Sequence, residues 1–266
     1  MKTALISLSR EGESIIRRLK TGLTDADIYL HEDTGSPSGG QTFESIAALT
    51  ADIFGRYQGL VYIAPCGVAV RAIAPYIRHK TSDPAVVVVD VGARYAISLL
   101  SGHEGGANEL AFTVGNILGC EPVITTTSEA RKTLIVGIGC RRGTKEEAIA
   151  EAIREALRLT ESDISEVRLL ASVDKKQDEE GLLMAALHLH IPVRFIPAEE
   201  IRASTRGFTH SELVKKRLNL PAVAEPAALL AGRRTTLILP KTIINGVTIA
   251  LARESFMWSE SDREDR

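Results

Sequence analysis

The chain has 266 residues, of which 44% are hydrophobic and 25% are charged, and its formal net charge is -2. This composition is typical of folded globular proteins, and the length suits two domains of ordinary size. The near-neutral charge excludes a global basic field that would hold nucleic acid. No apolar run reaches the roughly 18–20 residues that span a bilayer. We therefore expect a cytoplasmic protein that binds neither nucleic acid nor a membrane.

In the first half of the chain, strand and helix patterns alternate. Apolar, β-rich runs predict strands at residues 3–9, 26–32, 59–64, 84–90, 94–100 and 121–127. Apolar residues at helical spacing predict helices at residues 11–20, 43–57, 66–77 and 105–118. Residues 31–41 are dense in Gly, Ser and Pro and predict a loop. The turn "DVGA" predicts that the strands on either side of it pair antiparallel.

A second series of elements begins after the polar segment "TSEARK", residues 127–132. Strands are predicted at residues 133–139, 167–174, 192–197, 235–240 and 246–253. Asn245-Gly246 predicts a tight turn before the last of them. Helices are predicted at residues 144–159, 178–190, 211–218 and 225–232. In the first of these helices, Thr144 and Glu147 have the spacing of a capping box.

The predicted fold class is α/β, with two α/β domains whose mixed sheets are flanked by helices. We expect an N-terminal domain at residues 1–129 and a C-terminal domain at residues 133–254. Residues 255–266 are polar and are expected to form a loose tail.

The segment "GIGCRRGT", residues 137–144, follows a predicted strand and opens a predicted helix, as phosphate-binding loops do. Its glycines miss the dinucleotide pattern G-x-G-x-x-G by one residue, and the Walker pattern is absent. Arg141 and Arg142 beside a helix N-terminus favour binding of a carboxylate or another anion. The alternative is a plain strand-to-helix turn with solvated arginines.

The segment "SGHEGGAN", residues 101–108, crowds three glycines around one histidine and one glutamate. The glycines would let a ligand approach the backbone, where NH groups at the start of a helix are expected to be free. His103 could act as a general acid or base, with Glu104 as its partner. The alternative is a tight turn that His103 merely caps. An H-E-x-x-H zinc site is excluded because residue 107 is alanine.

Two further basic segments are candidates for anion binding. Arg71 and Arg78 would lie two turns apart on one helix face, although Pro75 between them could interrupt that helix. The same segment continues with His79 and Lys80. "DKKQDE", which contains Lys175 and Lys176, follows a strand at a place where α/β proteins commonly bind ligands. A solvated surface is the ordinary explanation of either segment.

The three cysteines, Cys66, Cys120 and Cys140, are an odd number and lack CxxC spacing. The sequence therefore predicts neither a disulfide framework nor a zinc site. Cys66 and Cys140 each adjoin a glycine loop without a histidine nearby in sequence, so we interpret them as buried structural thiols.

Several segments together resemble the cobalt-precorrin-5A hydrolase (CbiG) family of anaerobic cobalamin biosynthesis. "DPAVVVVDVGARYAISLLSGHEGGANELA" is similar to its N-terminal module. Five further segments resemble the family's C-terminal module and occur in the same order as in that module: "GIGCRRGT", "SVDKKQDEEGLL", "IPVRFIPAEEI", "LPAVAEPAALLAG" and "LILPKTIINGVTIALAR". Members often carry a segment between the modules, whereas here "VITTTSEARKTLIVGIG" joins them almost directly.

The resemblance implies an enzyme that opens the ring A lactone of a cobalt corrinoid and releases acetaldehyde. It implies no protein cofactor or metal site, because the cobalt arrives within the substrate. It supplies no catalytic residue, so the roles are our own inference: His103 and Glu104 for catalysis. The residues expected to bind the carboxylate-fringed macrocycle are Arg71, Arg78, Lys80, Ser101, Gly102, Gly105, Gly106, Asn108, Arg141, Arg142, Lys175 and Lys176.

Two other functions are compatible with the same residues. A corrinoid carrier or sensing module would bind the macrocycle without turnover, and a nucleotide-dependent enzyme would use "GIGCRRGT" to bind NAD or ATP. The sequence is also compatible with a homo-oligomer and with contacts to other enzymes of the pathway.

Overall fold

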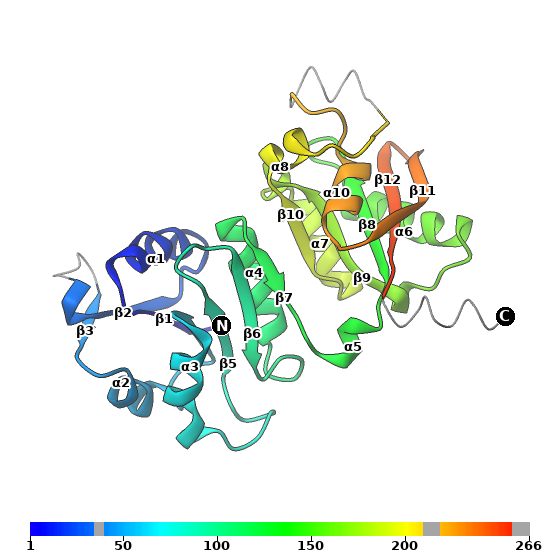
Figure 1. The fold of residues 1–266 in the computed structure, drawn as a ribbon. Coiled ribbons are helices and arrows are strands. Elements are labelled where there is room, and N and C mark those ends of the chain that lie inside the picture. Colours follow the sequence, from blue (N-terminus) through cyan, green and yellow to red (C-terminus); the bar gives the residue numbers. More distant parts are fainter. Residues whose placement is uncertain (35–39, 210–218, 257–266) are drawn as a thin grey trace. The chain divides into compact units, whose positions relative to one another are not determined.

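The computed structural model describes residues 1–34, 40–209 and 219–256 and divides into two compact units, Met1–Thr126 and Thr127–Arg266 (Figure 1). Each unit has its own mixed sheet with helices against it, so the predicted α/β class is confirmed. The predicted helix at 211–218, part of the predicted loop at 31–41 and most of the predicted tail lie outside the described residues.

The sheet of the first unit has seven strands in the order β3-β2-β1-β4-β5-β6-β7. They are β1 Thr3–Ser7, β2 Ala26–His31, β3 Gln41–Phe43, β4 Gly59–Ile63, β5 Ala85–Val89, β6 Tyr95–Leu100 and β7 Glu121–Val123. Neighbouring strands are parallel except β5 and β6, which pair antiparallel as predicted from the "DVGA" turn. Strands β6 and β7 therefore run opposite to the other five.

Helices cover both faces of this sheet. They are α1 Arg10–Gly22, α2 Ile46–Ile53, α3 Cys66–Ile73 and α4 Ala107–Leu118, with 3-10 turns η1 Glu32–Thr34 and η2 Ala74–Tyr76. Helices α1 and α4 pack on one face, in a core that contains Leu19 and Leu110, while α2 and α3 pack on the other, in a core that contains Ile53 and Ile73. The buried strands lie between these two layers.

The prediction that Arg71 and Arg78 share one helix face is wrong. Helix α3 ends at Ile73 and gives way to η2, in which Pro75 occupies the first turn. Proline has no NH to donate and its ring clashes with the preceding turn, so a continuous α-helix cannot pass through it. Arg78 therefore lies in the loop beyond η2, at the approach to β5.

The second unit begins with the short helix α5 Thr127–Ala130 and has a five-stranded sheet in the order β10-β9-β8-β12-β11. Its strands are β8 Leu134–Gly139, β9 Val167–Val173, β10 Val193–Ile196, β11 Thr235–Ile244 and β12 Val247–Glu254. Strands β8, β9 and β10 are parallel, and β11 and β12 form an antiparallel hairpin. Asn245 and Gly246, with φ of 51° and 80°, make the predicted tight turn.

The helices of the second unit are α6 Glu146–Leu159, α7 Glu180–Leu189, α8 Ala198–Ala203 and α10 Ala224–Leu230, with 3-10 turns η3 Ile164–Glu166 and η4 Asp174–Lys176. The capping box predicted for α6 is wrong. The helix starts at Glu146, and the Thr144 hydroxyl donates to the backbone oxygen of Arg141 at 2.8 Å instead of accepting from the helix. A local turn outcompetes the cap for this hydroxyl.

Helix α10 packs directly on β8, and Gly137 permits it. A Cβ added at Gly137 would lie 1.9 Å from the backbone oxygen of Ala224 and 2.9 Å from the Cβ of Ala228. A Cβ at Gly139, two residues along the same strand, would meet its nearest neighbours at an ordinary 3.5 Å. The first glycine of "GIGCRRGT" is thus required by helix packing.

Gly137→Ala should destabilise the second unit by about 1–3 kcal/mol or more, because backbone atoms of α10 would have to move. Gly139→Ala is the matched control and should cost distinctly less. Urea unfolding followed by circular dichroism measures both variants. Equal stabilities of the two variants would contradict the packing argument.

Candidate functional site

The SGHEGGAN loop, residues 101–108, connects β6 to α4. Leu100 at the end of β6 pairs with Val86 at the start of β5, so the loop lies at the edge where the parallel strands begin. A Cβ added at Gly106 would come 3.2 Å from the methyl group of Met1, which precedes β1 at the same edge. Ligands of open α/β sheets usually bind beyond the carboxyl ends of the strands. The SGHEGGAN loop lies at the opposite end of the sheet, beside the amino ends of the parallel strands.

The SGHEGGAN loop folds back on the first turn of α4. The backbone NH of Ala107 donates to Ser101 O at 3.1 Å, and that of Asn108 donates to Gly102 O at 2.9 Å. The expectation of free NH groups is therefore wrong for these two residues, because the loop's own carbonyls satisfy them. Gly105 packs so tightly that an added Cβ would lie 2.3 Å from the Cβ of Ser101.

Two polar side chains beneath the loop are buried. The Asn108 side-chain oxygen accepts from Ser98 Oγ at 2.8 Å, and its nitrogen donates to Thr126 Oγ1 at 3.1 Å. Asn108, predicted to bind substrate, thus uses both ends of its amide within the unit. Ser101 adopts φ 58°, and its buried hydroxyl has no hydrogen-bond partner among the described residues. A buried hydroxyl without a partner is unusual and marks this position as strained.

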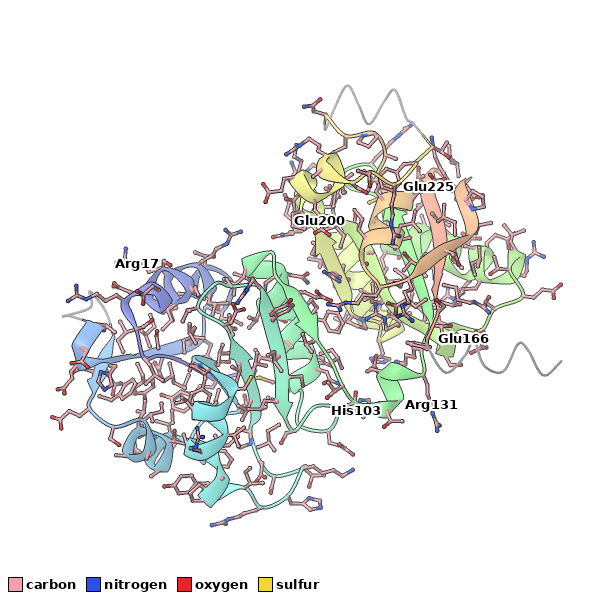
Figure 2. All side chains as sticks on the ribbon, in the orientation of Figure 1. Arg17, His103, Arg131, Glu166, Glu200 and Glu225 are labelled. Carbon is pink, nitrogen blue, oxygen red and sulfur yellow. The ribbon has the colours of Figure 1, made fainter. Side chains whose placement is uncertain are left out.

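Glu104 is held by Lys80, which lies in the loop between η2 and β5. The Lys80 ammonium and a Glu104 carboxylate oxygen are 2.5 Å apart. The hydrogen bond from Lys80 lowers the pKa of the Glu104 carboxyl. Among the described residues, no hydrogen bond joins Glu104 to His103, which is exposed on the surface of the first unit (Figure 2). The structure therefore brings Lys80 to the loop, as an ion-pair partner of Glu104.

The two arginines of the same basic segment have local contacts. The Arg71 guanidinium donates to the backbone oxygen of Gly67 on its own helix at 3.0 Å. The Arg78 backbone NH donates to the buried carboxylate of Asp83 at 2.9 Å, while its side chain is exposed. Among the described residues, no hydrogen bond or ion pair links either arginine to the SGHEGGAN loop.

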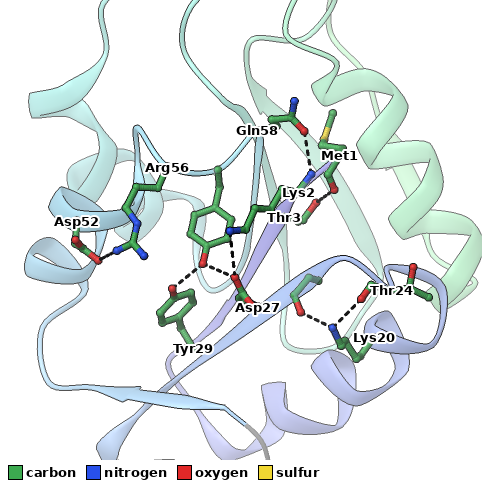
Figure 3. A network of polar contacts seen from close by, with 12 residues as sticks. Met1, Lys2, Thr3, Lys20, Thr24, Asp27, Tyr29, Asp52, Arg56 and Gln58 are labelled. Atoms are coloured by element: carbon green, nitrogen blue, oxygen red, sulfur yellow. Dashed lines mark hydrogen bonds and ion pairs between the residues drawn. The ribbon is translucent and has the colours of Figure 1, made fainter.

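A second polar network lies at the same edge of the first unit (Figure 3). The Tyr57 hydroxyl donates to Asp27 at 2.6 Å and lies 2.8 Å from the Tyr29 hydroxyl, and the Lys2 ammonium sits 5.2 Å from the centre of the Tyr57 ring. Burial, with the hydrogen bonds to Asp27 and Tyr29, raises the pKa of Tyr57. These contacts join the starts of β1, β2 and β4, and the sequence analysis did not single them out.

In the second unit, the "GIGCRRGT" and "DKKQDE" segments meet at the carboxyl ends of β8 and β9. Arg142 pairs with Asp178 at the surface. The backbone NH of Gly143 donates to one Glu179 oxygen at 3.2 Å, and the Lys176 ammonium contacts the other at 2.9 Å. The two predicted candidate segments thus form one cluster.

Glu179 occupies the position that an external anion was expected to take. The side chains of Lys176 and Glu179 are only 12% and 6% exposed, so their ion pair is buried. The loop NH and the lysine neutralise a carboxylate of the protein itself, which disfavours a nucleotide phosphate at this place. Arg141 and Lys175 are exposed beside the pair.

Cys140, at the end of β8, lies within this cluster. Burial raises the pKa of its thiol, although the Lys176 ammonium opposes the effect. A thiol with a raised pKa is a poor nucleophile, which agrees with a structural role. Among the described residues, no group of three His, Cys, Asp or Glu side chains is placed to hold a metal ion, and no helix has the length and apolarity to cross a membrane.

Sequence reasoning missed Glu225, which is only 2% exposed in the first turn of α10 (Figure 2). Its carboxylate accepts from the backbone NH groups of Thr209 at 2.6 Å and Lys241 at 2.8 Å. Burial alone would raise the pKa of this carboxyl, but these donors outweigh it and lower the pKa. The charged residue inside the apolar run "PAVAEPAALL" was the available signal. Its role is to tie three segments together.

Two family models match the chain. The model described as "Cobalamin synthesis G N-terminal" matches residues 48–129, and the model described as "Cobalamin synthesis G C-terminus" matches residues 134–252. The matches include the SGHEGGAN loop and "GIGCRRGT", respectively. Only residues 130–133 separate them.

Curated relatives align over much of the chain. Cobalt-precorrin-5A hydrolase of Priestia megaterium is 26% identical over 352 positions, which cover 94% of each chain. The protein of that name from Salmonella typhimurium is 27% identical and covers 74% of this chain and 82% of its own. Protein CobE of Sinorhizobium sp. is 34% identical over 50% of this chain and 88% of its own. The first alignment exceeds this chain's length, so that relative contains segments absent here.

Glu179→Ala should destabilise the second unit by about 3–5 kcal/mol, because it leaves Lys176 buried without its counter-charge. Arg142→Ala is the matched control: its ion pair with Asp178 is exposed, and its loss should cost at most about 1 kcal/mol. Urea unfolding measures both. If the two variants were equally stable, the buried pair would not be the structural link inferred above.

Proposed function

Because the chain belongs to the cobalamin synthesis G family, we propose that it is a cobalt-precorrin-5A hydrolase, which opens the ring A lactone of the cobalt corrinoid and releases acetaldehyde. The observation that carries the proposal is the match of both family modules, in order, across residues 48–252. The two curated hydrolases support it at 26% and 27% identity. As a member of a cobalamin biosynthesis family, the enzyme is expected to act in the cytoplasm.

The reaction needs three groups. Water attacks the lactone carbonyl, the ring C–O bond breaks, and a carboxylate and a free hydroxyl result. A base then takes the hydroxyl proton while the neighbouring C–C bond breaks, so that acetaldehyde leaves and the macrocycle carbon accepts a proton. The groups required are a base, a donor to the oxyanion and cations for the carboxylates.

The SGHEGGAN loop offers candidates for the first two roles. We assign His103 as the base, since it is exposed within a loop that backbone hydrogen bonds hold against the start of α4. The backbone NH groups of Gly105 and Gly106 are the candidate oxyanion donors, with no side chain to obstruct a flat macrocycle. Gly102 completes the loop's predicted contacts. The prediction that Ser101 binds substrate is wrong, because its side chain is buried beneath the loop.

Lys80 and Glu104, which we predict to bind substrate and to assist catalysis, form an ion pair with each other. A substrate carboxylate that binds Lys80 would compete with Glu104 for the same ammonium. Glu104, once released, is next in sequence to His103 and would stabilise the protonated imidazole. Substrate binding would in this way assemble the catalytic pair.

Other cations supply candidate contacts to the macrocycle's remaining carboxylates. The exposed ones are Arg71, Arg78, Arg141, Arg142 and Lys175. Lys176 is the weakest candidate, because Glu179 already neutralises it in a buried pair. Cobalt would enter as part of the substrate, so the proposal requires no protein cofactor. Self-association and contacts with other pathway enzymes are further proposals that binding measurements would address.

The decisive experiment is anaerobic incubation of the chain with the cobalt lactone intermediate, with acetaldehyde as the measured product. Stoichiometric or greater release supports the hydrolase. Binding of the corrinoid without release would instead support a carrier or sensing module and contradict the proposed activity.

His103→Ala should lower the rate of acetaldehyde release by about 100-fold to 10,000-fold, the usual contribution of a general base. The side chain is exposed, so the fold should be unchanged. His188→Ala, at an exposed histidine on α7 that is not a candidate site residue, is the control and should retain its rate. Full activity of His103→Ala would remove this residue from the mechanism.

Lys80→Gln should raise KM for the corrinoid more than it changes kcat, since the contact to the substrate carboxylate is lost while Glu104 is already free of its ion pair. Arg17→Gln, which breaks the exposed ion pair with Glu13 on α1, is the control and should leave both constants unchanged. An unchanged KM for Lys80→Gln, measured by acetaldehyde release, would refute the exchange of ion pairs.

A further inference from the structure

We infer that Thr126 and Ser98 are positioning residues that act through the Asn108 amide to hold the SGHEGGAN loop in its working geometry. The inference rests on the proposed function of that loop. Neither Thr126 nor Ser98 stood out in the sequence, and the hydrogen bond of each goes to Asn108.

Asn108 gathers three separate elements at one side chain. Ser98 comes from β6, Asn108 from α4, and Thr126 from the segment after β7, where the first unit ends. The Asn108 amide bridges the two hydroxyls at 2.8 Å and 3.1 Å. Since Asn108 is only 8% exposed, water gives little competition for these bonds.

The bridge reaches the loop through Gly102. The backbone NH of Asn108 donates to Gly102 O at 2.9 Å. A Cβ added at Gly102 would lie 2.9 Å from the Asn108 side-chain oxygen and 2.8 Å from the methyl group of Thr126. The backbone of Gly102 therefore rests against both side chains, and His103 is the next residue. A shift of either side chain moves the backbone that carries His103.

Thr126 and Ser98 contribute separately to the position of the loop. The Thr126 hydroxyl fixes the Asn108 amide, while its methyl group supports Gly102 directly. Ser98 fixes the other end of the amide from a different strand. Misplacement of a catalytic group by about 1 Å commonly costs about 100-fold in rate. Loss of the Thr126 hydroxyl should thus act on kcat more than on KM.

The test compares two substitutions at one position in the full chain. Thr126→Val keeps the branched shape and removes the hydroxyl, whereas Thr126→Ser keeps the hydroxyl. Thr113→Val is the matched control, because Thr113 is an exposed threonine of α4, the helix that carries Asn108, and its hydroxyl donates to Glu109 O on that helix at 3.0 Å. Ser98→Ala cuts the other bond of Asn108 and gives an independent test if Thr126→Val lowers the Tm.

Two readouts are used. The first is the imidazole proton resonance of His103 without substrate, assigned by its loss in His103→Ala. Thr126→Val and Ser98→Ala should shift it, Thr126→Ser should largely restore it, and Thr113→Val should leave it in place. The second is acetaldehyde release, in which Thr126→Val should lower kcat by about tenfold or more with a smaller change in KM.

An unshifted His103 resonance in folded Thr126→Val and Ser98→Ala variants would overturn the inference. So would a change in Tm alone, with kcat and the resonance unaffected, because that is the signature of a purely structural bond. If the wild-type chain released no acetaldehyde, the proposed function would fail, while the resonance comparison would still decide whether these residues position the loop.

Discussion

The turn at Asp90 is the constraint on which the candidate site of the first unit depends. The Asp90 carboxylate accepts from the backbone NH groups of Arg94 at 2.8 Å and Tyr95 at 2.9 Å, and it pairs with the Arg94 guanidinium. Burial opposes its charge, yet these donors lower its pKa. The turn reverses the chain, so β6 ends where β5 begins. That reversal places the SGHEGGAN loop beside Lys80.

Each glycine-rich motif contains a glycine that close packing requires. Gly105 lies against Ser101, and Gly137 lies against the backbone of α10. In neither place would a side chain fit, and neither glycine is explained by a phosphate. The loop that resembled a nucleotide site instead contacts Glu179, a carboxylate of the same unit. Loops that are held by their own hydrogen bonds in this way fix the positions of the side chains that they expose.

Several lysine and arginine side chains form ion pairs with carboxylates of the protein instead of making a continuous basic surface. The chain's net charge is -2, and Lys80, Arg142 and Lys176 each contact a carboxylate of the protein. The buried pair at Lys176 is costly to separate, whereas the exposed pairs at Lys80 and Arg142 exchange partners at little cost. An anionic ligand would therefore compete for the exposed cations. This difference in burial separates the binding candidates from the structural ones.

The sequence by itself determined the α/β class, the antiparallel turn and the Asn245-Gly246 hairpin, because apolar periodicity and turn chemistry are local properties. It indicated the family through the resemblance of its motifs. It could not decide that Pro75 separates Arg71 from Arg78, or that Thr144 serves a turn instead of a cap, since alternative local bonds compete. Only the tertiary structure decided that Glu104 pairs with Lys80 and that Asn108 reaches Thr126, because these partners come from different elements and meet only once the sheet has formed.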